Sequence, residues 1–319
     1  MTLSRPRASV SIDGRTLTSA EGALARLRVS LGFGPAHDAV ELALWPSSRF
    51  AAAGAGAAMS VALGEAGSEV DVWTGTVADV RAAADGVVID GLATTAALAT
   101  ARVSHTFLDQ SVADVIEGLV QEQSMAIDEV AGDAKLSAYS VDTRRSVWAH
   151  VLDLAALAGA DVSATAGGRL RVVPPRTGTA DATLRFGADV LAWSGGASAP
   201  ATAATVAASG AASEAGSDKW HWLLREPTAA GSGPVGVVAA LHTRDAAESM
   251  AKALTARASR SSVGARLRVV GAPAIRPGDL LEVADLPSGD LGVLRVLSVE
   301  HRLDGARGFV TALTAEGAA

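Results

Sequence analysis

Six histidines are the side chains in this sequence that could hold zinc or transfer protons near neutral pH. They are His37, His105, His150, His221, His242 and His301. No two of them have the i, i+4 spacing that places two zinc ligands on one face of a helix. His105 and Asp109 are four apart, and we interpret them as residues of a surface loop rather than as metal ligands. His150 and Asp153 lie one helical turn apart, and we interpret them as a solvated pair.

Sequence motifs of common enzymes are missing. There is no Gly-x-Ser-x-Gly elbow and no Gly-Lys-Ser/Thr phosphate loop, and the stretch from Gly54 to Gly56 lacks the third glycine of a dinucleotide loop. Glu117 and Glu122 could be paired for glycoside cleavage, but nearly any acidic helix offers such a pair. The absence of cysteine excludes thiolate metal sites and a cysteine nucleophile. We predict that the chain is not an enzyme and needs no cofactor or metal.

Four residues are candidates for contacts with other proteins. Trp220 and Trp222 flank a histidine, and tryptophan is enriched at subunit interfaces. The alternative is that one of them packs inward on a strand and the other is partly covered. Arg276 and Asp279 enclose Pro-Gly, a turn signal because proline fixes φ and glycine accepts a positive φ. We name these four as candidate interface residues.

The composition narrows the class of partner. The 319 residues carry 27 Lys+Arg against 34 Asp+Glu, a formal charge of −7, without a basic tract, so we expect no nucleic-acid recognition. Hydrophobic residues make up 49% of the chain, but none of its apolar runs reaches 18 residues without a charge or glycine. No apolar region follows the charged N-terminus, so we expect neither a signal peptide nor a membrane anchor.

The first hundred residues predict short strands, because polar and apolar residues alternate along them. The strands are expected at 8–12, 26–31, 38–45, 69–77 and 87–92. Asp13-Gly14 and Asp85-Gly86 are turn signals between such strands. Many short strands separated by glycine-rich turns are typical of a barrel or sandwich.

The pattern changes near residue 104. Ser111 with Asp114 three residues later predicts a helix start, and apolar residues then recur at helical spacing to Val120. A second helix is expected to begin at Asp142 and to stop at Gly159. A third is expected at 245–259. Strands are expected at 169–173, as a pair around Gly187 within 180–192, at 203–208, and at 267–270, 280–283, 292–301 and 308–313.

Several stretches, taken in order, resemble a known family. They are 107–116, 143–148, 152–155, 158–160, 168–174, 186–191 and 269–283, with a closing echo at 296–301 and 308–313. Together they resemble the late control protein D family of contractile phage tails. That family shares its fold with baseplate hub proteins and with the hub part of valine-glycine-repeat spike proteins. The resemblance covers roughly residues 100 to 319.

The resemblance implies an α+β fold that is mainly β, with two similar tube-forming β-barrel domains, short helices and a small inserted domain. The implied division is a first barrel at 1–103 completed by 179–205, a second barrel begun at 104–178 and finished at 263–319, and an inserted segment at 206–262. The Ala/Ser/Gly tract at 195–218 and the stretch 229–236 match nothing in the family and are expected to be inserted loops.

The resemblance also implies a function as a baseplate hub. Such hubs are homotrimers whose duplicated barrels match a sixfold tail tube on one side and a threefold spike on the other. The implied partners are a separate spike protein, the tail tube protein and baseplate wedge proteins. The chain would be assembled in the cytoplasm into a virion tail or an extracellular injection particle. Two alternatives stay open: a module that binds or degrades the cell envelope, and a tube-initiating or tape-measure-binding protein of the same particle.

Overall fold

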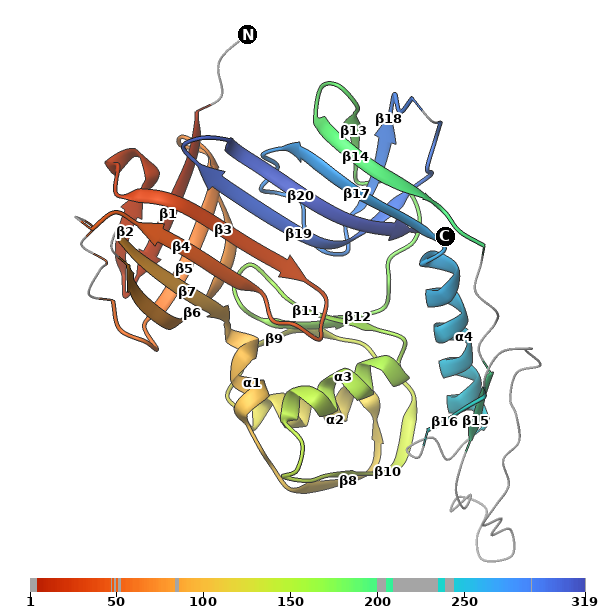
Figure 1. The fold of residues 1–319 in the computed structure, drawn as a ribbon. Helices are drawn as coiled ribbons and strands as arrows, with labels where there is room; N and C mark the ends of the chain where they lie inside the picture. Colours follow the sequence, from red (N-terminus) through yellow and green to blue (C-terminus); the bar gives the residue numbers. More distant parts are fainter. Residues whose placement is uncertain are drawn as a thin grey trace, which may run out of the picture.

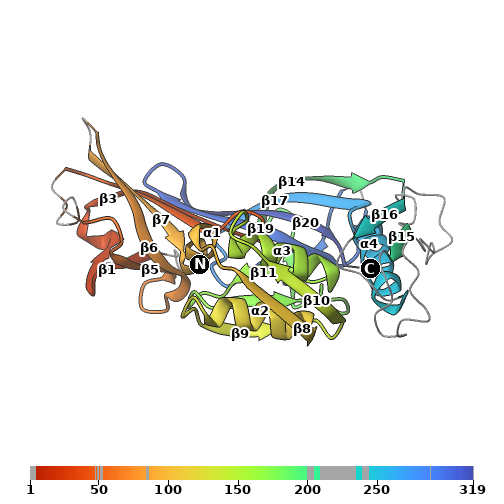
Figure 2. The same ribbon diagram turned by 90° about the horizontal axis from the view of Figure 1, so that it is seen from below.

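The computed structural model describes residues 5–46, 48, 50, 53–83, 86–199, 205–208, 235–238, 244–287 and 289–318. It is mainly β, as the sequence predicts. Most strands belong to one large, mainly antiparallel sheet in the upper part of Figure 1, and a smaller α/β unit lies against it. Figure 2 shows the same two layers from below.

The N-terminal half of the large sheet is formed by the first seven strands. They are β1 (Pro6–Ile12), β2 (Arg15–Thr18), β3 (Leu24–Gly32), β4 (Ala39–Leu44), β5 (Ala58–Glu65), β6 (Val70–Ala83) and β7 (Gly86–Ala93), with a 3-10 turn at Ser19–Glu21. They pair in the order β3-β4-β7-β6-β5-β1-β2. Alternate residues of β1 and β4 point into the core, which explains why the period-two pattern predicts these strands.

The C-terminal half is formed by strands from residue 182 onward. They are β13 (Ala182–Arg185), β14 (Val190–Ala197), β17 (Val263–Val270), β18 (Leu280–Ala284), β19 (Leu294–Asp304) and β20 (Gly308–Gly317). Four of them pair in the order β14-β17-β20-β19, and β18 pairs with both β19 and β13. β13 and β14 flank Gly187, as expected, but β13 pairs with β18 and β14 with β17 instead of with one another.

The two halves meet strand to strand. β3 pairs with β19 in antiparallel register, with Val29 opposite His301 and Leu31 opposite Val299. The result is one 13-stranded sheet whose hydrogen-bonded path runs from β14 to β2. A single hydrophobic core runs under both halves and includes Leu27, Trp73 and Leu313.

The α/β unit follows β7 in one run of chain. It contains η3 (Thr94–Ala96), α1 (Ala97–Thr100), β8 (His105–Ser111), α2 (Val112–Gln121), β9 (Ile127–Val130), β10 (Lys135–Val141), α3 (Val147–Leu157), β11 (Asp161–Ala164) and β12 (Leu170–Val173). β8 pairs with β10, and β12 lies between β11 and β9. A second hydrophobic core, with Ile116, Leu119 and Leu154 fully buried, holds these elements together.

The caps of the two helices decide where they begin. The Ser111 hydroxyl accepts a hydrogen bond from the Asp114 N–H at 3.1 Å, and the Asp114 carboxylate accepts one from the Ser111 N–H, which confirms the predicted capping box. The predicted start at Asp142 is wrong. Ser146 caps α3 through the Ala149 N–H at 3.2 Å, whereas Asp142 bonds Arg144.

A fourth helix connects the two cores. α4 (Arg244–Arg260) leads into β17, and its Ala251 is buried in the core of the α/β unit. β15 (Thr205–Ala208) and β16 (Val235–Val238) form a two-stranded parallel sheet beside it. Gly159, expected to end α3, has a φ of 65°, and a Cβ there would meet Ala253 of α4.

The segments that form the large sheet differ from the segments that were expected to form the two barrels. The strands within 104–178 form the two small sheets of the α/β unit and do not join the large sheet. β14, expected to complete the N-terminal barrel, pairs with β17 in the C-terminal half. Local alternation predicts that a strand exists but not which distant strand it will pair with, so the pairing had to come from the structure.

Candidate functional site

The predicted turn joins the two halves of the large sheet. Trp220 and Trp222 lie outside the described residues, so only Arg276 and Asp279 can be placed. The Asp279 carboxylate accepts a hydrogen bond from the Arg276 N–H at 2.7 Å, and the Asp279 N–H donates to the Arg276 carbonyl at 3.2 Å. These bonds close the turn just before β18, as the Pro-Gly signal predicts.

The Arg276 side chain reaches from this turn to the N-terminal half. Its guanidinium donates hydrogen bonds to the carbonyl oxygens of Val72, at 2.5 Å, and of Asp71 in β6. Burial lowers the pKa of Arg276, and the neighbouring carboxylates oppose this shift. Arg276 therefore ties the two halves of one chain together, and its role at a contact between subunits stays a prediction.

Two other buried titratable groups lie close to Arg276. Asp38 accepts a hydrogen bond from the Gly32 N–H at 2.8 Å, and burial raises its pKa to about 7, although that bond and the charge of Arg276 lower it. The His301 Nδ1 lies 3.0 Å from the Thr311 hydroxyl. Burial, with a smaller contribution from Arg276, lowers the pKa of His301 to about 3, so this imidazole is neutral.

The α/β unit is fixed to the large sheet by a buried ion network. Arg295 of β19 donates to Asp161 of β11 at 2.5 Å and to Glu316 of β20 at 2.7 Å. Arg260 at the end of α4 also bonds Glu316, at 3.3 Å. Only 4% of the Arg295 side chain is exposed, so the pairs are shielded from solvent.

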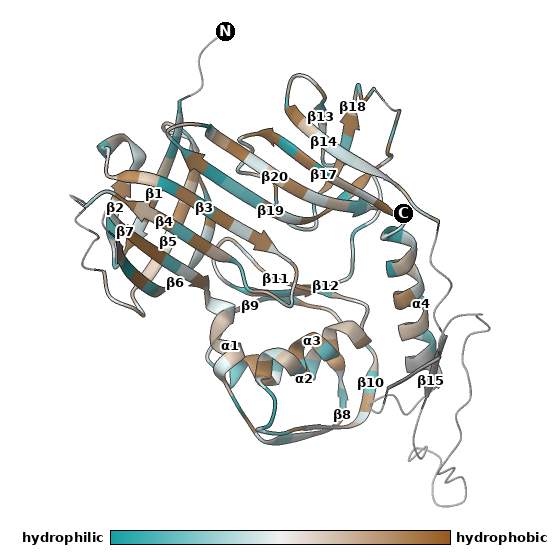
Figure 3. Ribbon diagram, viewed as in Figure 1, coloured by the Kyte–Doolittle hydropathy of each residue, from teal (hydrophilic) through white to brown (hydrophobic). Residues whose placement is uncertain are grey.

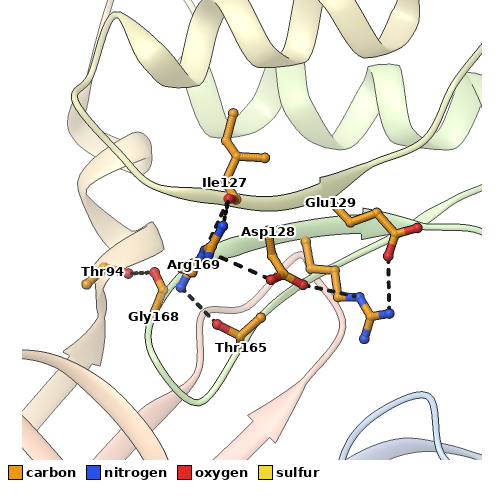
Figure 4. A network of polar contacts seen from close by, with 8 residues as sticks. Thr94, Ile127, Asp128, Glu129, Thr165, Gly168 and Arg169 are labelled. Atoms are coloured by element: carbon orange, nitrogen blue, oxygen red, sulfur yellow. Dashed lines mark hydrogen bonds and ion pairs between the residues drawn. The ribbon is translucent and has the colours of Figure 1, made fainter.

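A second junction lies at the β11–β12 turn (Figure 4). The Thr94 hydroxyl donates to the Gly168 carbonyl, and Arg169 donates to the Ile127 carbonyl at 2.5 and 3.1 Å. Arg171 pairs with Glu129 at 3.3 Å. Because β7 leads directly into Thr94, this network fixes the small sheet beneath the N-terminal half.

The outward face of the large sheet carries a group of arginines that we call the basic face. They alternate with buried residues along β3, β17 and β19, with one more in the β19–β20 turn; they are Arg26, Arg28, Arg266, Arg268, Arg302 and Arg307. Figure 3 shows the alternation of hydrophilic and hydrophobic residues along β3. Arginines at alternate positions of predicted strands were the sequence signal for this face, and the sequence analysis missed it.

Only part of the basic face is neutralised. Arg26 pairs with Glu41 at 2.6 Å, while Glu300 accepts from both Arg28, at 2.6 Å, and Arg302, at 2.5 Å. Among the described residues, no carboxylate pairs with the guanidinium groups of the other three arginines, although the backbone N–H of Arg307 donates to the Asp304 carboxylate at 2.7 Å. Since arginine stays charged, this face is positive although the whole chain is acidic.

The scattered histidines do not form a site. Among the described residues, no three His, Asp or Glu side chains gather to hold a metal ion. His105 belongs to β8 rather than to a loop, and it pairs with Glu122 at 3.4 Å. The solvated interpretation of His150 is wrong, because its ring is buried and lies 3.0 Å from the Tyr139 hydroxyl, while Asp153 pairs with Arg145. No described helix is long and apolar enough to cross a membrane.

One family model matches the chain over more than half of its length. It is described as the Alg8 N-terminal domain and matches residues 43–216. The description names no activity. A comparison with curated proteins found no match.

Several solved structures are similar to the fold. A 43 kDa tail protein of prophage MuSo2 from Shewanella oneidensis has a TM-score of 0.73 at 14% identity, with 98% of each chain covered. A tail protein from Neisseria meningitidis MC58 has a TM-score of 0.72 at 16% identity, covering 98% of this chain and 96% of that one. The E. coli c3393 protein, a component of the type VI secretion system, has a TM-score of 0.64 at 11% identity, covering 96% and 76%. The chain therefore has the fold of phage tail proteins and of a type VI secretion component.

Proposed function

This chain belongs to the family of the Alg8 N-terminal domain, and from its fold, which is similar to that of phage tail proteins, we propose that it is a structural baseplate hub. It would serve a contractile phage tail or a tail-like injection particle, joining the sixfold tail tube to the threefold spike. It acts by its geometry and not as an enzyme.

The observation that carries the proposal is the pairing of β3 with β19. Through it, one chain presents two sheet-bearing halves side by side in a continuous sheet, and Arg276 holds them in one orientation. Three such chains around an axis present six sheet halves, which match a sixfold tube. The same three chains match a threefold spike. The proposal assigns each half to a tube-type barrel and leaves the α/β unit as a separate layer.

The buried ion network supports this assignment. A hub must keep its layers in a defined orientation while it contacts unlike partners on its two sides. Arg295 links β19, β20 and β11, so the α/β unit is held to the C-terminal half by charge pairs as well as by packing. The proposed partners are two further copies of the chain, a separate spike protein, the tail tube protein and baseplate wedge proteins.

Light scattering of the purified chain, with and without the spike protein encoded nearby, tests the proposal. We expect a particle of three times the 32.0 kDa chain mass, either alone or once the spike is added. A chain that stays monomeric with its spike present would contradict the hub. Binding of peptidoglycan fragments by that monomer would favour the envelope-binding alternative.

A further inference from the structure

The basic face contains a depression of about 600 Å³ in the C-terminal half of the sheet. It is lined by Leu191, Arg268, Glu300, Arg302, Arg307, Val310 and Ala312. The lining residues come from β14, β17, β19, β20 and the β19–β20 turn, so the depression is built on paired strands. A binding surface on paired strands holds its side chains in a more defined arrangement than one on a loop.

The charge of the depression is unbalanced. Its single carboxylate, Glu300, already accepts hydrogen bonds from Arg28 and Arg302. Among the described residues, no carboxylate pairs with the guanidinium groups of Arg268 and Arg307, and only the backbone N–H of Arg307 bonds Asp304. Arg266 stands two residues before Arg268 on the same exposed face. In a chain of net charge −7, a local excess of arginine favours a negatively charged partner.

The spacing of the arginines fits an extended polypeptide. Residues two apart on a strand are about 7 Å apart and point to the same side. Arg266 and Arg268 therefore match carboxylates at alternate positions of an extended segment lying along β17. The guanidinium fork binds a carboxylate through two parallel hydrogen bonds, which adds geometry to the charge attraction.

The surroundings favour a polypeptide over a nucleic acid. Leu191 is 48% exposed and Val270 is 50% exposed, so apolar side chains border the arginines. The lining includes no aromatic ring on which a base could stack, and Glu300 would repel phosphates. Side chains at alternate positions of an extended segment point to the same side. Acidic residues at two successive alternate positions and an apolar residue at the next would therefore match Arg266, Arg268 and Val270.

We propose that the basic face around this depression docks an extended, acidic segment of a partner protein. Carboxylates of the segment pair with Arg266, Arg268 and Arg307, and an apolar side chain on the same side of the segment covers Val270 and Leu191. The site does not depend on the number of copies in the assembly. The basic face is exposed in the single chain, and the hub proposal names no partner for it. The docking site gives this face a partner of defined chemistry.

The probe is a short labelled peptide with glutamates at two successive alternate positions, valine at the next, and threonines between them, and fluorescence anisotropy is the measurement. We expect binding that weakens with salt, and at least a tenfold loss in the paired variant Arg268→Glu/Arg307→Glu. The control Arg15→Glu/Arg185→Glu makes the same charge change at exposed arginines away from this face and should bind like the wild type. Arg268→Gln/Arg307→Gln removes charge without reversing it and should give an intermediate loss.

Three results would overturn the proposal. The first is no binding of the peptide by the wild-type chain at low salt. The second is an equal loss in the control variant, which would mean that only net charge matters. The third is tighter binding of a single-stranded oligonucleotide than of the peptide, which would assign the face to phosphates. If the substitutions change the mass of the particle instead, the face is a contact between copies, and the inference fails while the hub assembly stands.

Discussion

The large sheet and the α/β unit are built in opposite ways. The sheet joins strands from both ends of the chain, and Arg28 bonds Glu300 across 272 positions of sequence. The α/β unit takes its sheets and its helices α1 to α3 from one continuous run, 94–173. Non-local pairing costs more loop-closure entropy, so the sheet depends on completing its core and its junctions. The unit can begin from local signals such as helix caps.

β3 from the N-terminal half and β19 from the C-terminal half pair within one sheet and share one hydrophobic core. A substitution that destabilises one half should therefore destabilise the other. The α/β unit has its own core and meets the sheet through a few defined contacts, with Arg295 the most buried of them. The following substitutions test whether the two regions depend on each other in this way.

Arg295→Ala should have the largest effect. It removes the partner that Asp161 and Glu316 share and leaves Glu316 with only the longer contact to Arg260, and removing one member of a buried pair costs about 3–5 kcal/mol. We expect a large fall in the free energy of unfolding and a separation of the transitions of the two regions. Denaturant titration measures both, with fluorescence followed in variants that retain only Trp73, in the large sheet, or only Trp148, in the α/β unit. Arg171→Ala, which removes an exposed pair, should cost less than about 1 kcal/mol. Equal costs would show that the network does not couple the regions.

Asp38→Asn should change how stability depends on pH. The folded-state pKa of Asp38 is raised from 3.8 to about 7, so the folded state holds this proton more tightly than the unfolded state does. Stability from this group is full below pH 3.8 and is lost as the pH rises to about 7. Removing it should raise the free energy of unfolding relative to wild type by about 2–4 kcal/mol above pH 7.

Thermal unfolding from pH 4 to 8 measures the effect of Asp38→Asn. Asp133→Asn, at an exposed position of the α/β unit, is the matched control and should follow the wild-type curve. An Asp38→Asn curve that runs parallel to the wild type throughout would mean that the junction near Arg276 does not perturb this carboxyl.

Ser111→Ala should have the smallest effect and should act on the α/β unit. It removes the cap of α2 and costs about 1 kcal/mol. Hydrogen exchange should show faster exchange in α2 and its neighbours, with the β3–β19 amides unchanged. The same loss of protection in β3 would mean that the two regions unfold as one.

The sequence predicted helix caps and turns but not contacts between distant segments, because a sequence pattern covers only a short window of residues. The capping box at Ser111 and the turn at Arg276 are formed by residues three apart, so their pattern is complete within a short window. The partner of Arg276 in β6 lies 204 positions away, and nothing near Arg276 encodes it. His150 was misread because a helical pair does not reveal which side of the helix is covered by Tyr139.

The arginines of the basic face show a different limit. Each strand was predicted separately, and the charges at alternate positions of β3, β17 and β19 acquire meaning only when the strands lie side by side. The family resemblance predicted the type of fold found among phage tail proteins. The division of the chain into two tube-type barrels can be tested only in the assembled particle, and it stays a proposal.

Electron cryomicroscopy of the purified chain bound to its tail tube protein tests the central claim most directly. We expect, in views along the tube axis, three copies whose N-terminal and C-terminal sheet halves alternate around the ring and give six similar segments facing the tube. A ring in which only one half of each chain meets the tube, or a single copy at its end, would contradict the account.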